Sequence, residues 1–314
     1  MFGLGLRRKA ARVGCRLASG LLGIKPMTLG EVAIEEWLVH RLLDPEVGKA
    51  YGVTAADKKR LVAGMQAACA GIRGATGWQA HLVMATQILR IPPQAEGVVV
   101  ECGCYTGAST ASLSLVCRMT GRQLLVFDSF QGLPSEGLQL HHYPHKQVYG
   151  YYKEGMYAAS LELVKANVAR YGHLPSCRMV PGFFCDTLVG LDQPVVFAWL
   201  DVDLLSSLTD CIRHIWPRLM DGGYIYTDDS SDMEVVRIWF DEPWWKKEFG
   251  IRPPGYVGTG SGLTLNLHGS SLGYAQKVVE YATAYGRIEW LHYPDREPEP
   301  AGKAAGAGPG AASD

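Results

Sequence analysis

The sequence lacks both a strong net charge and a long apolar run. Its 30 lysines and arginines nearly balance its 31 aspartates and glutamates, which gives a formal net charge of −1 over 314 residues. A chain without excess positive charge offers no electrostatic basis for binding nucleic acid. No run of about 18 apolar residues occurs, so we expect no membrane span. With 47% hydrophobic and 19% charged residues, the composition is that of an ordinary globular protein.

Cysteines are too few for a disulfide framework. The chain has eight of them, far below the density of small disulfide-rich domains. Cys102 and Cys104 are close in sequence, but no second pair follows at the spacing of zinc ligands. We therefore expect small buried thiols in a reducing compartment, and hence a cytoplasmic location.

The first residues lack the features of a clear targeting signal. Basic residues within 7–12 precede a weakly apolar stretch, 13–24. Arg16 and Gly20 interrupt that stretch, and no clean cleavage motif follows it. An amphipathic helix is therefore expected here rather than a signal peptide.

Alternation of strands and helices begins near residue 97, after a helical region expected over 1–95. Apolar periodicity predicts helices at 31–43, 55–72 and 77–90, and then at 108–119, 158–171, 184–189 and 207–219. Short apolar runs between the later helices predict strands at 97–103, 123–129, 177–182, 194–203 and 222–229. This order is typical of the α/β class, with a Rossmann-like, doubly wound parallel sheet in one domain, 96–268.

An insertion over 130–157 interrupts the alternation. Its 28 residues hold three histidines and five tyrosines without clear periodicity. Because this is too long for a simple connector, we expect an active-site lid, with a disordered excursion as the alternative. The histidines are expected to be solvated loop residues. His142 could assist a general base, but the sequence gives no specific reason to assign it this role.

Aromatic and low-complexity segments follow the last predicted strand. The tryptophans within 233–249 have helical spacing, so they are expected partly in the core and partly in the wall of a pocket. A C-terminal extension is expected over 269–298, with a helix near 274–283 and a strand near 287–293. The tail, 299–314, is expected to be disordered.

Two pairs of aspartates stand at the ends of consecutive predicted strands. Asp201 and Asp203 end one strand, and Asp228 and Asp229 end the next. Each pair alone is more typical of a solvated loop or a helix cap. Because the carboxyl ends of parallel strands meet at one edge, the two pairs together would repel each other unless a hard cation lay between them. The sequence therefore predicts a Mg²⁺-type site.

The first strand ends in a glycine-containing loop. Glu101, Gly103 and Gly107 form the pattern E-x-G-x-x-x-G, which allows a tight turn and close approach of a ligand. The pattern departs from the G-x-G-x-x-G of dinucleotide folds, so it disfavours NAD and favours S-adenosylmethionine (SAM). Asp128 at the end of the second strand suits hydrogen bonds to ribose hydroxyls.

Several stretches in order resemble the macrocin O-methyltransferase family of metal-dependent enzymes that methylate deoxysugars of macrolides and aminocoumarins. They are VVVECGCYTGASTASLSLVCRMTGRQLLVFDSFQGLP, YKEGMYAASLELVKANVARYG, VPGFFCDTL, AWLDVDLLSS and PRLMDGGYIYTDD. The resemblance covers about 80–268. It implies a SAM-dependent, Mg²⁺-dependent O-methyltransferase that takes a small hydroxylated acceptor and forms a homo-oligomer.

The resemblance also implies roles for particular residues. Asp201, Asp228 and Asp229 would hold Mg²⁺, and Asp203 would be the general base. The residues implied for SAM are Glu101, Gly103, Tyr105 and Gly107 at the methionine end, Asp128 at the ribose, Ser129 and Phe130 beside the ribose and adenine, and Gly182, Phe183 and Asp186 at the adenine. Thr106 stands where the sugar enzymes carry a basic residue, which leaves the acceptor open.

Four interpretations are compatible with these patterns. The first is methylation of a sugar hydroxyl on a glycosylated natural product. The second is the same chemistry on a catechol-like, polyketide or peptide hydroxyl. The third is a non-catalytic protein with a SAM-binding fold, against which the intact acids argue. The fourth, an NAD enzyme, is disfavoured by the glycine spacing.

Overall fold

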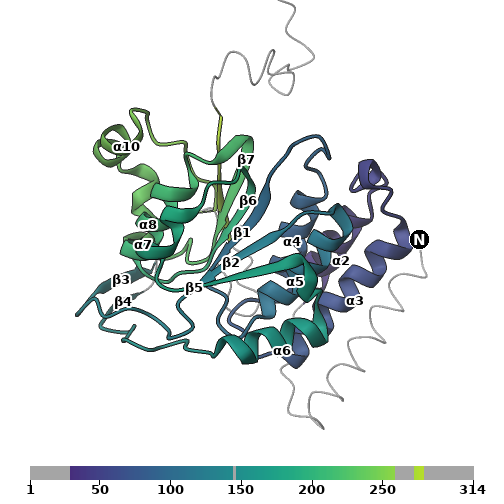
Figure 1. Cartoon of the computed structure of the whole chain (residues 1–314), viewed down its shortest axis with the longest axis horizontal. Coiled ribbons are helices and arrows are strands. Elements are labelled where there is room, and N and C mark those ends of the chain that lie inside the picture. Colours follow the sequence, from purple (N-terminus) through teal and green to yellow (C-terminus); the bar gives the residue numbers. More distant parts are fainter. Residues whose placement is uncertain (1–28, 144–145, 259–271, 279–314) are drawn as a thin grey trace, which may run out of the picture. The chain divides into compact units, whose positions relative to one another are not determined.

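The computed structural model describes residues 29–143, 146–258 and 272–278. Its centre is a six-stranded sheet in the order β5-β2-β1-β6-β7-β8 (Figure 1). The strands are β1 Val98–Cys102, β2 Leu124–Asp128, β5 Cys177–Pro181, β6 Val195–Leu200, β7 Leu219–Thr227 and β8 Gly273–Gln276. The first five are parallel and β8 is antiparallel to β7. The predicted Rossmann-like α/β fold is confirmed, and all five predicted parallel strands are present.

The sheet has a topological switch point between β1 and β6. From β1 the chain moves outward through β2 to β5, and then returns to the other side of β1 as β6. The ends of the central strands are level, because Cys102 pairs with Leu200 and Leu200 pairs with Thr227. The next residues, Gly103, Asp201 and Asp228, therefore leave the sheet at the same edge. This edge is where open α/β sheets bind ligands.

Helices cover both faces of the sheet (Figure 1). One face packs against α2 Leu29–Leu43, α3 Ala55–Gly71, α4 Trp78–Ile88, α5 Ala108–Thr120 and α6 Leu161–Tyr171. The other packs against α7 Phe184–Thr187, α8 Leu205–Ile215, α9 Met233–Val236 and α10 Glu242–Phe249. Short 3₁₀ turns are η1 Lys49–Tyr51, η2 Leu174–Ser176, η3 Leu188–Gly190 and η4 Arg237–Phe240. Side chains alternate between the faces, since Trp199 joins one core and Leu200 the other.

The helix starts follow from capping side chains. Thr54 and Asp57 form a reciprocal capping box at the start of α3. Ser160 accepts a hydrogen bond from the backbone N–H of Leu163, so α6 begins at Leu161 rather than at the expected 158.

Among the described residues, no helix combines the length and apolar character needed to cross a membrane.

Two segments differ from the sequence-based expectation. The insertion contains a hairpin, β3 Leu140–Tyr143 and β4 Lys146–Tyr149, where no element was expected. The helix expected near 274–283 is wrong at its start, because β8 occupies Gly273–Gln276. Tyr274 stacks on Tyr226 of β7 with ring centroids 5.1 Å apart, which stabilises an edge strand at this place. The sheet thus continues beyond 268, the expected end of its domain.

The other terminal expectations lie outside the described residues. These are the amphipathic helix at 13–24, the strand near 287–293 and the disordered tail at 299–314.

The tryptophan segment packs into the core. Trp239 and Trp245 are fully buried, and Trp245 donates its indole N–H to the carbonyl of Ile238 at 2.7 Å. Trp216 meets Trp245 edge to face, with centroids 4.9 Å apart. The expected core role is confirmed for Trp239 and Trp245. None of them lines the cavity at the carboxyl edge of the sheet.

Candidate active site

A cavity of about 430 Å³ lies at the carboxyl edge of the sheet. Nine of the sequence-predicted site residues line it, namely Gly103, Tyr105, Asp128, Ser129, Phe183, Asp201, Asp203, Asp228 and Asp229. Five others do not line it, namely Glu101, Gly107, Phe130, Gly182 and Asp186. The strand ends thus bring the glycine loop and both aspartate pairs into one cavity, as their positions in the parallel sheet predict.

The glycine loop is held against the neighbouring strand end. Gly103 has φ +82°, and a Cβ there would lie 1.9 Å from the backbone oxygen of Asp201. Gly107 has φ +92° and is the N-cap residue of α5. The close contact between the two backbones therefore requires glycine at position 103, whether or not a ligand also approaches the loop.

Glu101 is a buried carboxylic acid beneath this loop. It is fully buried, and one carboxylate oxygen accepts a hydrogen bond from the Ser109 hydroxyl at 2.5 Å. The other oxygen has no hydrogen-bond partner among the described residues. Burial raises the pKa of Glu101 to about 7, with the Ser109 hydrogen bond acting in the opposite direction. A buried acceptor without a partner is typical of a site completed by a ligand or water.

Asp128 at the end of β2 joins two loops of the cavity wall. Its two carboxylate oxygens accept from the backbone N–H groups of Cys104 and Phe130, each at 2.7 Å. Each oxygen keeps a further lone pair, so the side chain can still accept from hydroxyls in the cavity. The Ser129 hydroxyl donates to the carbonyl of Gly132 at 2.8 Å, which ties β2 to the start of the insertion.

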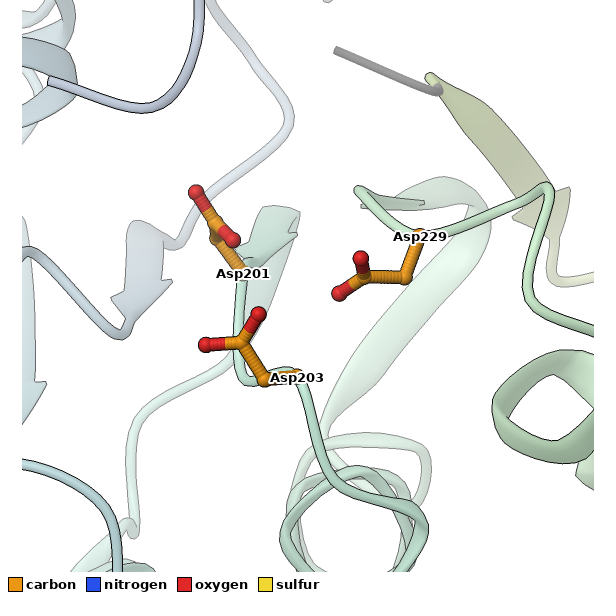
Figure 2. A group of neighbouring side chains, drawn as sticks. All are labelled: Asp201, Asp203 and Asp229. Carbon is orange, nitrogen blue, oxygen red and sulfur yellow. The ribbon is translucent and has the colours of Figure 1, made fainter. Parts of the chain in front are cut away.

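Three carboxylates converge on one point. Asp201 and Asp203 follow β6 and Asp229 follows β7, and Figure 2 shows their side chains directed toward a shared space. Each residue contributes one carboxylate oxygen, and these three oxygens all lie within 4.8 Å of one another. This trio differs from the set assigned to the metal by the family resemblance, which contains Asp228 in place of Asp203. Asp228 is nevertheless buried and lines the same cavity.

The carboxylates are costly to ionise together. Burial raises the pKa of Asp201 well above its usual range, and the charges of Asp228 and Asp203 raise it further. Burial likewise raises the pKa of Asp229, with Asp203 as the next largest cause. For Asp203, burial raises the pKa to about 7 against an opposing hydrogen bond from Tyr152. Such shifts are typical of functional sites.

Strained backbone is concentrated around the cavity. Within the described ranges, the non-glycine residues with positive φ are Tyr105, Phe130, Tyr157, Asp203 and Asp229, with values from +46° to +60°. Four of the five line the cavity. Left-handed conformations at non-glycine residues are costly and tend to occur where function requires them.

Part of the insertion lines the cavity, and we refer to residues 130–157, the predicted lid, as the lid segment. Its two ends are joined by backbone hydrogen bonds from Leu133 to Met156 and from Gly155 to Leu133. Tyr152 and Tyr157 from this segment line the cavity, and the Tyr157 ring lies 5.5 Å from that of Tyr105.

One histidine of the lid segment is not a solvated loop residue. His141 is 1% exposed and its Nδ1 lies 2.5 Å from Oδ2 of Asp232. The expectation of solvent exposure was wrong for this residue, because a buried acid 91 residues away accommodates it. His142 contributes only its backbone N–H, which donates to Asp232 at 3.0 Å.

With this geometry established, the chain can be compared with known proteins. The model of the macrocin-O-methyltransferase (TylF) family matches residues 81–254, which is more than half of the chain. The chain belongs to this family.

Curated relatives of the family match over part of their length. An 8-demethyl-8-(2,3-dimethoxy-alpha-L-rhamnosyl)-tetracenomycin-C 4'-O-methyltransferase of Streptomyces olivaceus is 37% identical over 140 residues, 43% of this chain and 53% of the relative. Mycinamicin III 3''-O-methyltransferase of Micromonospora griseorubida is 30% identical over 139 residues, 42% of this chain and 55% of the relative. The chain thus spans about half the length of the curated relatives it matches.

A solved structure confirms the fold. The O-methyltransferase NovP superposes with a TM-score of 0.51 at 20% identity, covering 66% of this chain and 84% of NovP.

This member of the macrocin-O-methyltransferase family has cavity residues that sequence reasoning missed. They include Gly74, Ala75 and Thr76 between α3 and α4, residues 132–136, Tyr152 and Met156 of the lid segment, and Ser206, Ser207 and Asp210 of α8. The Thr106 hydroxyl donates to the carbonyl of Arg73, which joins the glycine loop to the turn before α4. The residues of the lid segment lie within the predicted lid, although the sequence selected none of them individually, and no local pattern marks the positions before α4 or in α8.

Proposed function

We propose that the protein is a Mg²⁺-dependent O-methyltransferase that moves a methyl group from SAM to a hydroxyl of a small molecule. The observation that carries the proposal is the convergence of Asp201, Asp203 and Asp229 in the same cavity as the glycine loop. A carboxylate cluster suits a hard divalent cation, and the glycine loop at a switch point suits an adenosyl cofactor. Family membership supports the same chemistry.

The residues at the switch point fit SAM. A cavity of about 430 Å³ is within the usual range for small-molecule sites. In the proposed arrangement, Glu101, Gly103, Tyr105 and Gly107 hold the methionine end, Asp128 holds the ribose, and Ser129, Phe130, Gly182, Phe183 and Asp186 surround the adenine. The free oxygen of buried Glu101 provides an acceptor for an ammonium group. Bound SAM supplies an electrophilic methyl group.

The acids fit a divalent cation. We assign Asp201, Asp228 and Asp229 as its ligands. Burial and the charges of the neighbouring acids make simultaneous ionisation unfavourable, as the raised pKa values of Asp201 and Asp229 indicate. A bound Mg²⁺ would supply charge compensation and lower the pKa of an acceptor hydroxyl.

Asp203 is assigned as the general base. Its carboxylate lies beside Asp201 and Asp229 in the cavity, so it can accept a proton from a hydroxyl held at that site. The acceptor oxygen forms a bond to the methyl carbon while the carbon–sulfur bond breaks, and the hydroxyl proton passes to Asp203. The products are the methyl ether and S-adenosylhomocysteine. The cavity residues hold the two reactants in line for this displacement.

A sugar hydroxyl is the acceptor that the relatives favour. The names of two curated relatives specify methylation on a rhamnosyl-bearing tetracenomycin and on mycinamicin III. We therefore propose a deoxysugar of a glycosylated natural product. A catechol-like or other aromatic acceptor is the second candidate, because Tyr105, Tyr152 and Tyr157 line the cavity and can pack on a flat ring.

Calorimetry with S-adenosylhomocysteine, with and without Mg²⁺, tests the proposal. Binding of the nucleoside product is expected in both conditions, and the apoprotein should bind Mg²⁺ on its own. No binding of S-adenosylhomocysteine would overturn the assignment. A screen of sugar and catechol acceptors for a mass gain of about 14 Da then separates the two acceptor classes.

A further inference from the structure

The lid segment is joined to the loop after β7 by a buried pair. His141 of β3 and Asp232 are each 1% exposed, and Nδ1 of the histidine lies 2.5 Å from Oδ2 of the aspartate. The other carboxylate oxygen accepts from the backbone N–H groups of His142 and Glu234, at 3.0 and 3.1 Å. Asp232 therefore binds the lid hairpin and caps α9 at the same time.

The pair is connected to the carboxylate cluster along the chain. The backbone N–H of Asp232 donates to the carbonyl of Asp229 at 2.7 Å. Asp229 has φ +54° and lies in the cluster. The same short turn thus carries a cluster carboxylate at one end and the lid contact at the other.

A second connection runs through Tyr152. Its ring packs edge to face on the His141 ring, with centroids 4.6 Å apart. Hydrogen bonding by its hydroxyl opposes the rise in the pKa of Asp203, and it acts in the same direction on the pKa of Tyr143 in the same lid segment. Tyr152 lines the cavity, whereas His141 does not. The histidine ring therefore packs on a tyrosine that lines the same cavity as the assigned base.

A buried histidine–aspartate pair is poorly explained by stability alone. Taking two polar groups out of water costs free energy, and apolar residues of similar size would pack as well or better. The second ring nitrogen of His141 has no partner among the described residues, which adds to that cost. Arrangements of this kind are retained where they fix one conformation.

We propose that the His141–Asp232 pair is a latch that holds the lid segment against the carboxylate loop, and that the latch positions Tyr152 so that its hydroxyl orients Asp203 toward the acceptor. His141, Asp232 and Tyr152 are then positioning residues. The inference rests on the proposed methyl transfer for its kinetic part, but the latch itself is a property of the fold.

Four variants test the latch. Tyr152→Phe keeps the ring on His141 and removes the hydroxyl from Asp203. His141→Phe keeps a ring against Tyr152 and removes the donor to Asp232, whereas His141→Asn retains an N–H near the position of Nδ1. Tyr149→Phe is the matched control, because Tyr149 is 71% exposed on β4 and loses the same hydroxyl. Each is measured for lid proteolysis, S-adenosylhomocysteine affinity, and kcat and KM of the full-length protein.

The expected results separate positioning from general damage. Tyr152→Phe should lower kcat by about 10- to 100-fold, since misplaced catalytic groups cost rates of this order, with unchanged lid protection and product affinity. His141→Phe should lower kcat similarly and also speed cleavage within 130–157, and His141→Asn should restore protection. Tyr149→Phe should match the wild type. If His141→Phe fails to fold, Asp232→Asn, whose amide oxygen can still cap α9, takes its place.

The outcomes that overturn the proposal differ from those that overturn the methyltransferase assignment. Wild-type kcat in Tyr152→Phe refutes the positioning role, and unchanged lid protection in His141→Phe refutes the latch. If the wild-type protein neither binds S-adenosylhomocysteine nor methylates any acceptor, the proposed function fails. The proteolysis comparison still decides whether the latch exists in that case.

Discussion

The backbone carbonyl of Asp201 lies against the α-carbon of Gly103, so closely that a Cβ at Gly103 would be 1.9 Å from that oxygen. This contact joins the end of β1 to the end of β6 at the switch point of the sheet. It also couples the proposed cofactor loop to the proposed metal site, because a shift at one residue must move the other.

Gly103→Ala should therefore impair both functions of the cavity. The added methyl group meets backbone rather than a flexible side chain, and φ +82° is itself unfavourable for alanine. We expect loss of S-adenosylhomocysteine binding and of Mg²⁺ binding in calorimetry, together with a lower free energy of unfolding. Gly121→Ala is the control, because Gly121 has φ +67° with no atom within 4 Å of its Cβ position. Equal effects of the two substitutions would mean that strain alone, and not the contact with Asp201, is responsible.

The carboxylate cluster should destabilise the metal-free protein. Because burial and the neighbouring acids raise the pKa of Asp201 in the folded state, its contribution to stability is present at low pH and is lost as the pH rises through the folded pKa. Asp201→Asn should thus raise Tm at pH 8 without metal by several degrees. Mg²⁺ should raise the Tm of the wild type and not that of the variant. A variant that is less stable than the wild type at pH 8 would show that the cluster is not strained by its charges.

Asp203→Asn and Asp228→Asn should separate the base from the ligand. We expect Asp203→Asn to bind Mg²⁺ and S-adenosylhomocysteine normally but to lose about 10²- to 10⁴-fold in kcat, the usual effect of general base catalysis. Asp228→Asn should instead weaken Mg²⁺ binding. Because Asp203 lies close to Asp201 and Asp229, it could bind the metal instead of Asp228. Loss of Mg²⁺ binding in Asp203→Asn would make Asp203 a ligand and leave Asp228 as a neighbouring acid.

Local patterns were sufficient for the sheet and for its carboxyl edge. The central strands are continuous apolar runs that end at glycine or aspartate. The parallel order of the strands then brings Gly103, Asp128, Asp201 and Asp228 to one edge, regardless of the conformation of the loops. The lid contacts could not be found in this way. His141 meets Asp232 across 91 residues, and β8 pairs with β7 after a gap of more than 40 residues. Such contacts depend on tertiary packing, which cannot be predicted from the periodicity of apolar residues within a short segment.

The turn before α4 provides a last test, through a buried histidine. His81 is fully buried, and its ring nitrogens lie 2.8 Å from the Thr76 hydroxyl and 2.9 Å from the Ser112 hydroxyl. Burial lowers its pKa to about 4 from 6.5. The unfolded chain therefore binds a proton at a higher pH than the folded one, so this histidine stabilises the fold fully above pH 6.5 and the stabilisation is lost as the pH falls toward 4.

The expected loss is about 3 kcal/mol across that interval, from about 1.4 kcal/mol per pKa unit. Buried acids with raised pKa values act in the opposite direction, so the free energy of unfolding of the wild type must be compared with that of His81→Gln at each pH. The difference between the two should shrink as the pH falls from 7 to 4, because the variant has no imidazole to protonate. Parallel curves would mean that the pKa of His81 is the same in the folded and the unfolded protein. Thr76 lines the cavity, so the same protonation should weaken S-adenosylhomocysteine binding more in the wild type than in the variant as the pH falls toward 4.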